Sequence, residues 1–475
     1  MFGLAATAAG ASESKPVDTT ELAAWLTGGI SSNRLARLVR ERGLATLPTR
    51  SELRQLEEAG AGPDLMRVAK SGDAQSAEIG PPIPESVLTA AAEARQQRYH
   101  EAELDLRQAL NLDTQNSALH FALSVMLRQQ EQWDDAFDEA TEATRLLPEL
   151  PENHSALAYI FYRLDDGPNA IAEARTALSI DPKNAEAFQY LGLGLYTIEQ
   201  DKAAVHAFDE SLAYDPDNAD TYYDTGIALH ADGNAPAAIK AYEHAIRLRP
   251  EFWEAHSNLA LVLHEQGDLA RAVAEYRDAK RLAPDEASVR NNLANTYCDQ
   301  GNFDSAIAEM QELYRQHPEW QQGHACLASA YMAKKNYDRA IEQLRLAVIQ
   351  NPTGSAEHRV LGQALLLDNR AEDALRELRL AVSLNPDSEA AHHELGTALF
   401  EEQQFSAAER EFREALRINA SAENHYSLAA CLMSMDRYEE ALSELNTAAQ
   451  LDPERSLYRA RRDELLKLMK ESTSR

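Results

Sequence analysis

The chain has 475 residues, and its charged and apolar residues are interspersed throughout, as is typical of a folded soluble protein. No run approaches the roughly 18 apolar residues that a membrane-spanning helix needs, so the sequence excludes an integral membrane protein. The formal net charge of -31 repels phosphate backbones and anionic lipids, which argues against nucleic-acid and membrane-surface partners.

Neither the N-terminus nor the cysteines identify the compartment of the protein. The start, MFGLAATAAGASES, has small residues and a short apolar part, but no basic residue before Lys15. Two interpretations of residues 1–17 stay open: a disordered start, or the remnant of an export signal, which would make the protein periplasmic or exported rather than cytoplasmic. Cys298, Cys326 and Cys431 are too few and too scattered to predict a disulfide framework or a cysteine-based zinc site.

Residues 18–70 predict a separate compact module of three or four short helices. Ser32 can cap the helix SNRLARLVRERG and Thr49 can cap the helix SELRQLEEAG, and a glycine that can end the helix follows each of them. The Gly-, Pro- and Ser-rich stretch 71–84 predicts a linker. The module is similar to small helical modules found ahead of repeat arrays in some bacterial proteins, a likeness that implies no chemistry.

From residue 83 onward, one period of 34 residues organises the chain. Prolines recur at this spacing at Pro148, Pro182, Pro216, Pro250, Pro284, Pro318, Pro352 and Pro386. An alanine recurs in the same phase from Ala102 to Ala408, and again at Ala441 after a deletion of one residue. The repeats therefore start at residues 83, 117, 151, 185, 219, 253, 287, 321, 355, 389 and 422.

Each copy contains two segments whose apolar residues recur at helical spacing. A short polar turn separates the two segments, and an Asp-Pro or Asn-Pro follows the second one. Proline forces its predecessor out of the helical region, so it ends the second helix. A small residue in each first segment lets the two helices approach, and we expect it to meet an alanine of the partner helix. One copy cannot bury its apolar face alone, so neighbouring copies stack.

The stretch 185–218, AEAFQYLGLGLYTIEQDKAAVHAFDESLAYDPDN, resembles the tetratricopeptide repeat. The residues at signature positions of that family are Phe188, Leu191, Gly192, Ala204, Phe208 and Pro216. The resemblance implies an all-α fold: a right-handed superhelical α-solenoid of about eleven helical hairpins over residues 83–455. The leucines of residues 456–475 predict a capping helix and tail.

The histidines do not predict a metal site. Seven of the 14 occupy the fourth position of a repeat: His120, His154, His256, His324, His358, His392 and His425. Equivalent positions lie roughly 8 to 10 Å apart, too far to share one ion, so packing is the expected role. The pair His393-Glu394 lacks the second histidine of a zinc-protease helix, because Thr397 stands there. We expect no metal, no cofactor and no catalytic residues, since nucleophile and phosphate-loop motifs are also missing from the sequence.

The resemblance implies that the first helix of each hairpin lines a groove that binds a peptide. The candidate groove residues are Phe121, Tyr159, Tyr162, Tyr196, Tyr223, Asn258, Asn291, Asn295, Arg359, His393 and Phe400. Tyrosine buries a large area and keeps a hydroxyl for a partner, and asparagine can hydrogen-bond a peptide backbone. The alternative that the tyrosines only fill space between first helices stays open.

The sequence favours a non-enzymatic scaffold that binds peptide or protein partners in its groove. An accessory or adaptor subunit of an enzyme or secretion assembly, with the N-terminal module as a second docking site, is the alternative. We expect an apolar or basic partner, because the acidic chain repels acidic ligands and no lysine accompanies Asn291 and Asn295. Self-association through the ends of the array stays open.

Overall fold

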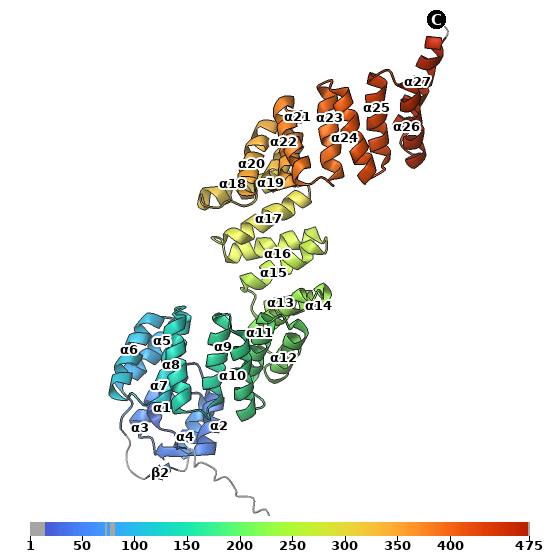
Figure 1. The fold of residues 1–475 in the computed structure, drawn as a ribbon. Helices are drawn as coiled ribbons and strands as arrows, with labels where there is room; N and C mark the ends of the chain where they lie inside the picture. Colours follow the sequence, from blue (N-terminus) through green and yellow to red (C-terminus); the bar gives the residue numbers. More distant parts are fainter. Residues whose placement is uncertain (1–14, 72–73, 77–80, 474–475) are drawn as a thin grey trace, which may run out of the picture. The chain divides into compact units, whose positions relative to one another are not determined.

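The structure, a computed structural model, describes residues 15–71, 74–76 and 81–473, so most of the predicted start at residues 1–17 lies outside it. The described residues form 27 α-helices and two three-residue strands, which confirms the predicted all-α repeat fold (Figure 1). Two compact units make up the chain, unit 1 (Met1–Ala255) and unit 2 (His256–Arg475).

The N-terminal segment contains four helices and both strands. Its elements are α1 (Thr19–Thr27), α2 (Ser32–Arg42), β1 (Leu44–Thr46), α3 (Arg50–Glu58), α4 (Pro63–Ser71) and β2 (Ala74–Ser76). The strands pair in parallel, with Leu44 opposite Ala74, so the stretch predicted as a linker contributes a strand to this segment.

Eleven helical hairpins and a final helix follow. They are α5 (Glu85–Arg95), α6 (Tyr99–Leu112), α7 (Ser117–Gln129), α8 (Trp133–Leu146), α9 (Pro151–Arg163), α10 (Gly167–Ile180), α11 (Ala185–Thr197), α12 (Asp201–Tyr214), α13 (Ala219–Ala231), α14 (Ala235–Leu248), α15 (Trp253–Glu265), α16 (Leu269–Leu282), α17 (Ala287–Asp299), α18 (Phe303–Gln316), α19 (His324–Ala333), α20 (Tyr337–Gln350), α21 (Ser355–Leu367), α22 (Ala371–Leu384), α23 (Glu389–Glu401), α24 (Phe405–Ile418), α25 (Ala422–Ser434), α26 (Tyr438–Leu451) and α27 (Ser456–Thr473). In nine of the eleven repeats, the first helix begins at the residue that was predicted as the start of the repeat. In the repeat at 321 the helix begins later, because Gly323 adopts a left-handed φ of 89° just before it.

Capping of the N-terminal helices agrees with the sequence in one case and differs in the other. Thr49 caps α3, since its hydroxyl accepts the N–H of Glu52 and the Glu52 carboxylate accepts the N–H of Thr49. The prediction that Ser32 caps α2 was wrong, because the Ser31 hydroxyl accepts the N–H of Arg34. Ser32 instead accepts the N–H of Gly62 at 2.8 Å and so ties α2 to the start of α4.

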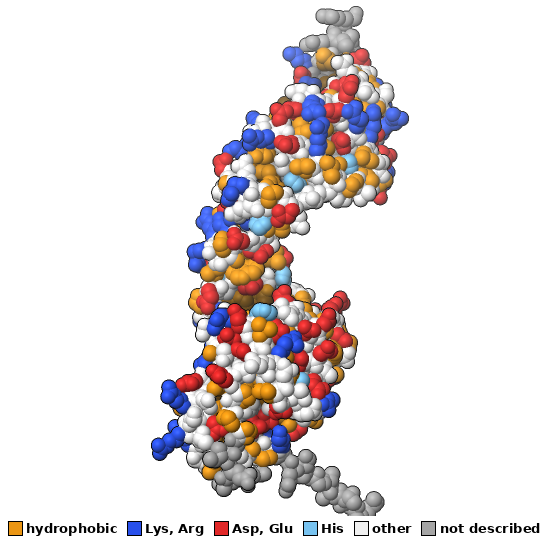
Figure 2. Space-filling view, turned by 90° about the vertical axis from the view of Figure 1, so that its left-hand side faces the viewer, with side chains coloured by type: hydrophobic (Ala, Val, Ile, Leu, Met, Phe, Trp, Pro, Cys, Tyr) orange, Lys and Arg blue, Asp and Glu red, His pale blue; other side chains and the backbone are white. Residues whose placement is uncertain are grey.

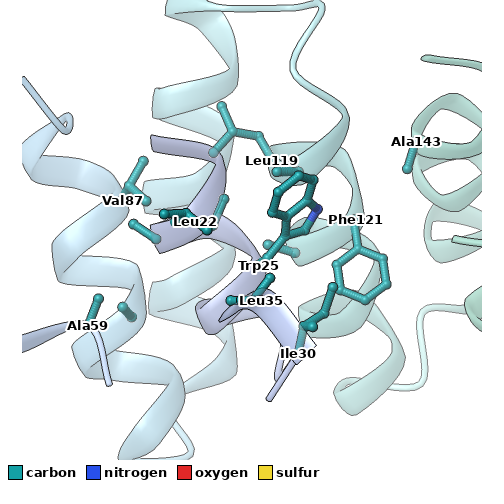
Figure 3. Packing of buried hydrophobic residues seen from close by; sticks show 14 of the residues in the cluster. Leu22, Trp25, Ile30, Leu35, Ala59, Val87, Leu119, Phe121 and Ala143 are labelled. Atoms are coloured by element: carbon teal, nitrogen blue, oxygen red, sulfur yellow. The ribbon is translucent and has the colours of Figure 1, made fainter. Parts of the chain in front are cut away.

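The N-terminal segment and the first hairpins share one hydrophobic core. Leu22 and Trp25 of α1 are buried in the same cluster as Val87 of α5 and Leu119 and Phe121 of α7, and Figure 3 shows Trp25 beside Phe121. The segment therefore packs onto the array instead of standing apart as the separate module that the sequence predicted. The physical reason is that a few short helices have too small a core of their own, so packing on α5 and α7 removes further apolar side chains from water.

The hairpin geometry follows from the residues at its turns. The turn between the two helices places one residue in the left-handed region, such as Glu131 (φ 58°), Asp165 (φ 60°) and, where the repeat supplies glycine, Gly233 (φ 76°). The residue before each repeat proline leaves the helical region, as Asp215 (φ -133°, ψ 82°) does after α12, and Asp181 (φ -124°, ψ 95°) after α10 is fully extended. These two backbone states reverse the chain within and between hairpins.

The small residue of the first helix meets the second helix one turn later than predicted. A Cβ built on Gly226 would lie 2.5 Å from the ring of Tyr242, and one on Gly192 would lie 2.4 Å from the ring of Phe208. At Gly192 and Gly226 the missing side chain thus makes room for a large buried ring 16 residues on, one helical turn after the repeat alanine. Tyr242 and Phe208 are fully buried and form the centre of their hairpins.

Candidate functional site: side chains on the first helices

The tyrosines predicted for unit 1 form part of an aromatic cluster centred on Tyr159. The ring centroid of Tyr159 lies 5.2 Å from Tyr190 of the next hairpin, 6.2 Å from Tyr162 and 6.2 Å from Trp133. The guanidinium carbon of Arg128 lies 4.3 Å from the Tyr159 centroid. Tilted ring contacts and the cation over Tyr159 hold these side chains in place, so the cluster presents a preordered surface.

Tyr162 and Tyr196 line one cavity of about 380 Å³ between neighbouring hairpins. Both side chains are half-buried, and burial raises the pKa of the Tyr162 hydroxyl above its ordinary value, with Asp224 adding to the effect. Tyr223 belongs to a different group, since its ring centroid lies 4.8 Å from Phe252 and 6.0 Å from Tyr242. The structure therefore brings Tyr159, Tyr162 and Tyr196 together and places Tyr223 in a separate aromatic group.

Phe121 is covered by the protein itself. It is only 6% exposed, and a Cβ on Gly28 would lie 2.7 Å from its ring, so the turn after α1 sits directly on it. Arg34 of α2 holds this arrangement, because its Nε donates to Glu152 at 2.5 Å. We therefore leave Phe121 out of the proposed binding surface.

An acidic group lies beside the tyrosines of unit 1. The Asp224 carboxylate accepts a hydrogen bond of 2.7 Å from the amide of Gln189. Burial, strengthened by the charge of Asp220, raises the pKa of Asp224 to about 7, although the bond from Gln189 works in the opposite direction. Asp224 therefore changes charge near neutral pH.

The asparagines predicted for unit 2 differ in exposure. Asn258 and Asn295 are half-buried, whereas Asn291 is 7% exposed and donates to the Oδ1 of Asn292 at 3.3 Å. The Asn291 side chain packs under Gly323, whose Cβ would lie 2.9 Å from its Oδ1. A continuous row of exposed amides is therefore not formed by these three residues.

The remaining candidates gather on α21 and α23 of unit 2. Arg359 forms an ion pair of 2.5 Å with Glu394, and the Nε2 of His393 lies 3.0 Å from the Ser427 hydroxyl of α25. The Phe400 ring packs 5.5 Å from that of Phe405. Side chains of α21, α23 and α25 enclose a cavity of about 630 Å³.

The sequence prediction missed the sixth position of the repeat. Tyr190, Asp224 and Glu394 all occupy it, and each contacts a residue of the preceding first helix. The polar contacts join residues 35 apart, Gln189 with Asp224 and Arg359 with Glu394. For Asp224 and Glu394 the available signal was an acidic residue one place after a predicted groove residue, Tyr223 or His393.

The structure contains a disulfide bond, which the sequence did not predict. Cys298 of α17 and Cys326 of α19 are joined by a disulfide, with Cα atoms 6.0 Å apart, and Cys431 is a free, buried thiol. Spacing alone did not predict the pair, which is 28 positions apart in sequence, because the second helix α18 returns the chain to the neighbouring first helix. The bond therefore ties two consecutive repeats of unit 2 together.

Six of the seven histidines at the fourth repeat position contact a glutamate of the second helix in the same hairpin, whereas the Nδ1 of His324 lies 2.8 Å from the amide oxygen of Gln343. The Nδ1 of His154 lies 2.6 Å from Glu173, 19 residues later, and its Nε2 donates to the carbonyl of Pro148 at 2.9 Å. Burial alone lowers the pKa of His154, but these two hydrogen bonds outweigh it, so the pKa is raised above its ordinary value. The same His–Glu contact occurs for His120, His256, His358, His392 and His425 at 2.5–2.7 Å.

Within residues 15–71, 74–76 and 81–473, no cluster of three or more histidine, cysteine or carboxylate side chains has a metal-binding arrangement. In the same residues, no helix combines the length and apolarity needed to span a membrane. Acidic, basic and apolar side chains are interspersed on the face shown in Figure 2.

Comparison with known families identifies the repeat. One tetratricopeptide repeat model matches residues 191–243, 231–287, 291–355 and 327–389, and a second matches residues 399–462. Together the matched segments cover more than half of the chain. The chain therefore belongs to the tetratricopeptide repeat family, a class of helical repeat proteins that act as protein-interaction scaffolds.

Several solved structures are similar to parts of the chain. A crystal structure of MamA is 24% identical over 34% of this chain and 95% of its own, with a TM-score of 0.30. The APC/C hetero-tetramer Cut9-Hcn1 is 13% identical over 81% of this chain and 90% of its own, with a TM-score of 0.41. Yeast Tom70 is 15% identical over 81% of this chain and 94% of its own, with a TM-score of 0.34. No curated protein matches the chain in sequence.

Proposed function

We propose that the protein is a non-enzymatic scaffold that captures a peptide or protein segment on the first helices of its hairpins. The observation that carries the proposal is the cluster around Tyr159, whose half-buried ring packs at a tilt against Tyr162 and the buried Tyr190 and lies below the guanidinium of Arg128. Such rings lose little conformational freedom on binding, so contact with a partner is stabilising at small entropic cost. Aromatic and arginine side chains are also the residues that most often dominate binding energy.

The chemistry of these surfaces favours a partner with apolar and basic side chains. The net charge of -31 disfavours an acidic partner at long range. In unit 1 the tyrosine faces supply apolar area, and Asp224 supplies a carboxylate next to them. Asn258 and Asn295 of unit 2 are half-buried and can contribute side-chain amides to a bound backbone.

The experiment is affinity capture from native extract with the full chain and a variant in which Tyr159, Tyr162, Tyr196 and Tyr223 are alanine. We expect weaker capture by the variant, with the helical circular dichroism retained. A matched control is Tyr337→Ala, which removes a half-buried tyrosine from the second helix of a hairpin. Equal capture by wild type and the quadruple variant would refute the role of the cluster. Loss of helix in the variant would show that the tyrosines are space-filling.

A further inference from the structure

We propose that the cavity between α21, α23 and α25 binds one arginine or lysine side chain of the captured segment. This inference rests on the proposed scaffold function and names the chemistry of its ligand. The cavity has a volume of about 630 Å³ and lies entirely within unit 2. We call it the acidic cavity.

The acidic cavity is lined by negatively charged side chains and by no lysine or arginine. Glu389, Glu394, Glu401 and Glu423 supply these side chains. Arg359 neutralises Glu394 from outside the lining, at 2.5 Å. Glu401 and Glu423 are exposed and have no ion-pair partner within residues 15–71, 74–76 and 81–473. Carboxylates gathered in a hollow surface concentrate their field, so a cation is attracted to it.

The hydrogen-bonding groups of the cavity also call for a donor. Asn424 lines the cavity and is 1% exposed. Its Nδ2 already donates to Glu389 at 2.7 Å and to the carbonyl of Asn419 at 2.9 Å. Its Oδ1 has no hydrogen-bond partner among the described residues, and neither does the Oε2 of Glu394. Guanidinium and ammonium groups carry only donors, so they match a site whose unused groups are acceptors.

The cavity wall suits a cation on an aliphatic stem. Leu366, Leu367 and Ala390 line the same space as the carboxylates, and Leu367 is 48% exposed. The His393 ring forms part of the lining and is held 5.7 Å from the ring of Phe412. Arginine and lysine bury their methylene stems along apolar surface while the charged head reaches polar groups. A bare inorganic ion would leave this apolar wall unused.

The test uses the full-length protein and fluorescent decapeptide mixtures with one fixed central residue and degenerate flanks. The fixed residue is arginine, lysine, citrulline or glutamate, and binding is measured by fluorescence anisotropy. We expect the arginine and lysine mixtures to bind about ten-fold more tightly than the citrulline mixture, which has nearly the same shape without charge. The glutamate mixture should bind most weakly.

The variant Glu401→Gln/Glu423→Gln should bind the arginine mixture about ten-fold more weakly, because two exposed ion pairs are lost. The matched control Glu402→Gln/Glu439→Gln removes the same charge from exposed residues outside the cavity and should bind as wild type does. Equal affinity for arginine and citrulline, equal losses in both variants, or no binding of any mixture would overturn the proposal.

The two proposals fail separately. If extract capture depends on the tyrosines while arginine and citrulline mixtures bind equally, the scaffold proposal stands and the acidic cavity does not. If the arginine mixture binds through Glu401 and Glu423 while the tyrosine variant captures normally, the acidic cavity stands without the aromatic cluster.

Discussion

The histidine–glutamate pairs make the stability of unit 1 depend on pH. We take the variant Glu139→Gln/Glu173→Gln, which removes the carboxylates that face His120 and His154 at 2.5 and 2.6 Å. Each histidine is about one-tenth exposed, and Glu139 and Glu173 are 18% and 28% exposed. A hydrogen bond to a charged partner contributes about 1.5–3 kcal/mol, and this partial exposure favours the lower end, so the two pairs together contribute about 3 kcal/mol.

The sign of the pH dependence follows from the direction of the pKa shifts. The pKa values of both His120 and His154 are raised in the folded protein, where the bonds to glutamate and to a backbone carbonyl outweigh burial. The stabilising contribution is therefore complete below the unfolded value of about 6.5 and is lost as pH rises through the raised folded pKa. Wild type should lose stability over this window, and the variant should lose less.

The assay is urea unfolding of the full chain, followed by circular dichroism at several pH values between about 5.5 and 8.5, on both sides of the histidine pKa. The control Glu101→Gln/Glu251→Gln removes two exposed carboxylates of unit 1 and should keep the wild-type pH profile. If the double variant at Glu139 and Glu173 unfolds with a profile parallel to wild type, the pairs do not couple protonation to stability and the reasoning fails.

Three further predictions concern buried contacts. Asp224→Asn should stabilise the protein increasingly as pH rises from about 4 to about 7, because between the ordinary pKa of an unfolded aspartate, about 3.9, and the folded pKa of about 7 the folded carboxyl keeps a proton that the unfolded one has lost; an unchanged difference in urea midpoint over this range would refute this. Cys298→Ser/Cys326→Ser should lower the free energy of unfolding by about 3–4 kcal/mol, as expected for a closed loop of this length, and thiol titration of unfolded wild type should count one free thiol. Gly28→Val should lower the free energy of unfolding by about 1–3 kcal/mol, because the added side chain overpacks against Phe121. The double variant Gly28→Val/Phe121→Leu should recover part of this loss of stability. If it recovers none, the clash lies elsewhere.

Sequence periodicity predicted most of the array because each hairpin is specified locally. The apolar spacing, the turn and the proline occur within 34 residues, and each acts on backbone conformation nearby. The first helices therefore begin where the phase of Pro182 and its equivalents places them. Tyr159, Tyr162 and Tyr196 could be assigned to first helices for the same reason.

Contacts between repeats could not be predicted in this way. The pairs Gln189–Asp224 and Arg359–Glu394 lie 35 residues apart, one more than the period, because the fifth position of one repeat contacts the sixth position of the next. Which positions face each other is set by side-chain packing between helices and not by any local pattern. The sixth repeat position was missed for this reason.

The sequence by itself determined the class of fold, the phase of the repeats and the absence of nucleophile and phosphate-loop motifs. Only the tertiary structure decided that the N-terminal helices share a core with the first hairpins and cover Phe121. It also decided that Cys298 meets Cys326 and that carboxylates gather around Asn424. The physical reason is the same in each case. Local propensities fix where helices begin and end, whereas burial of apolar area fixes which of their side chains meet.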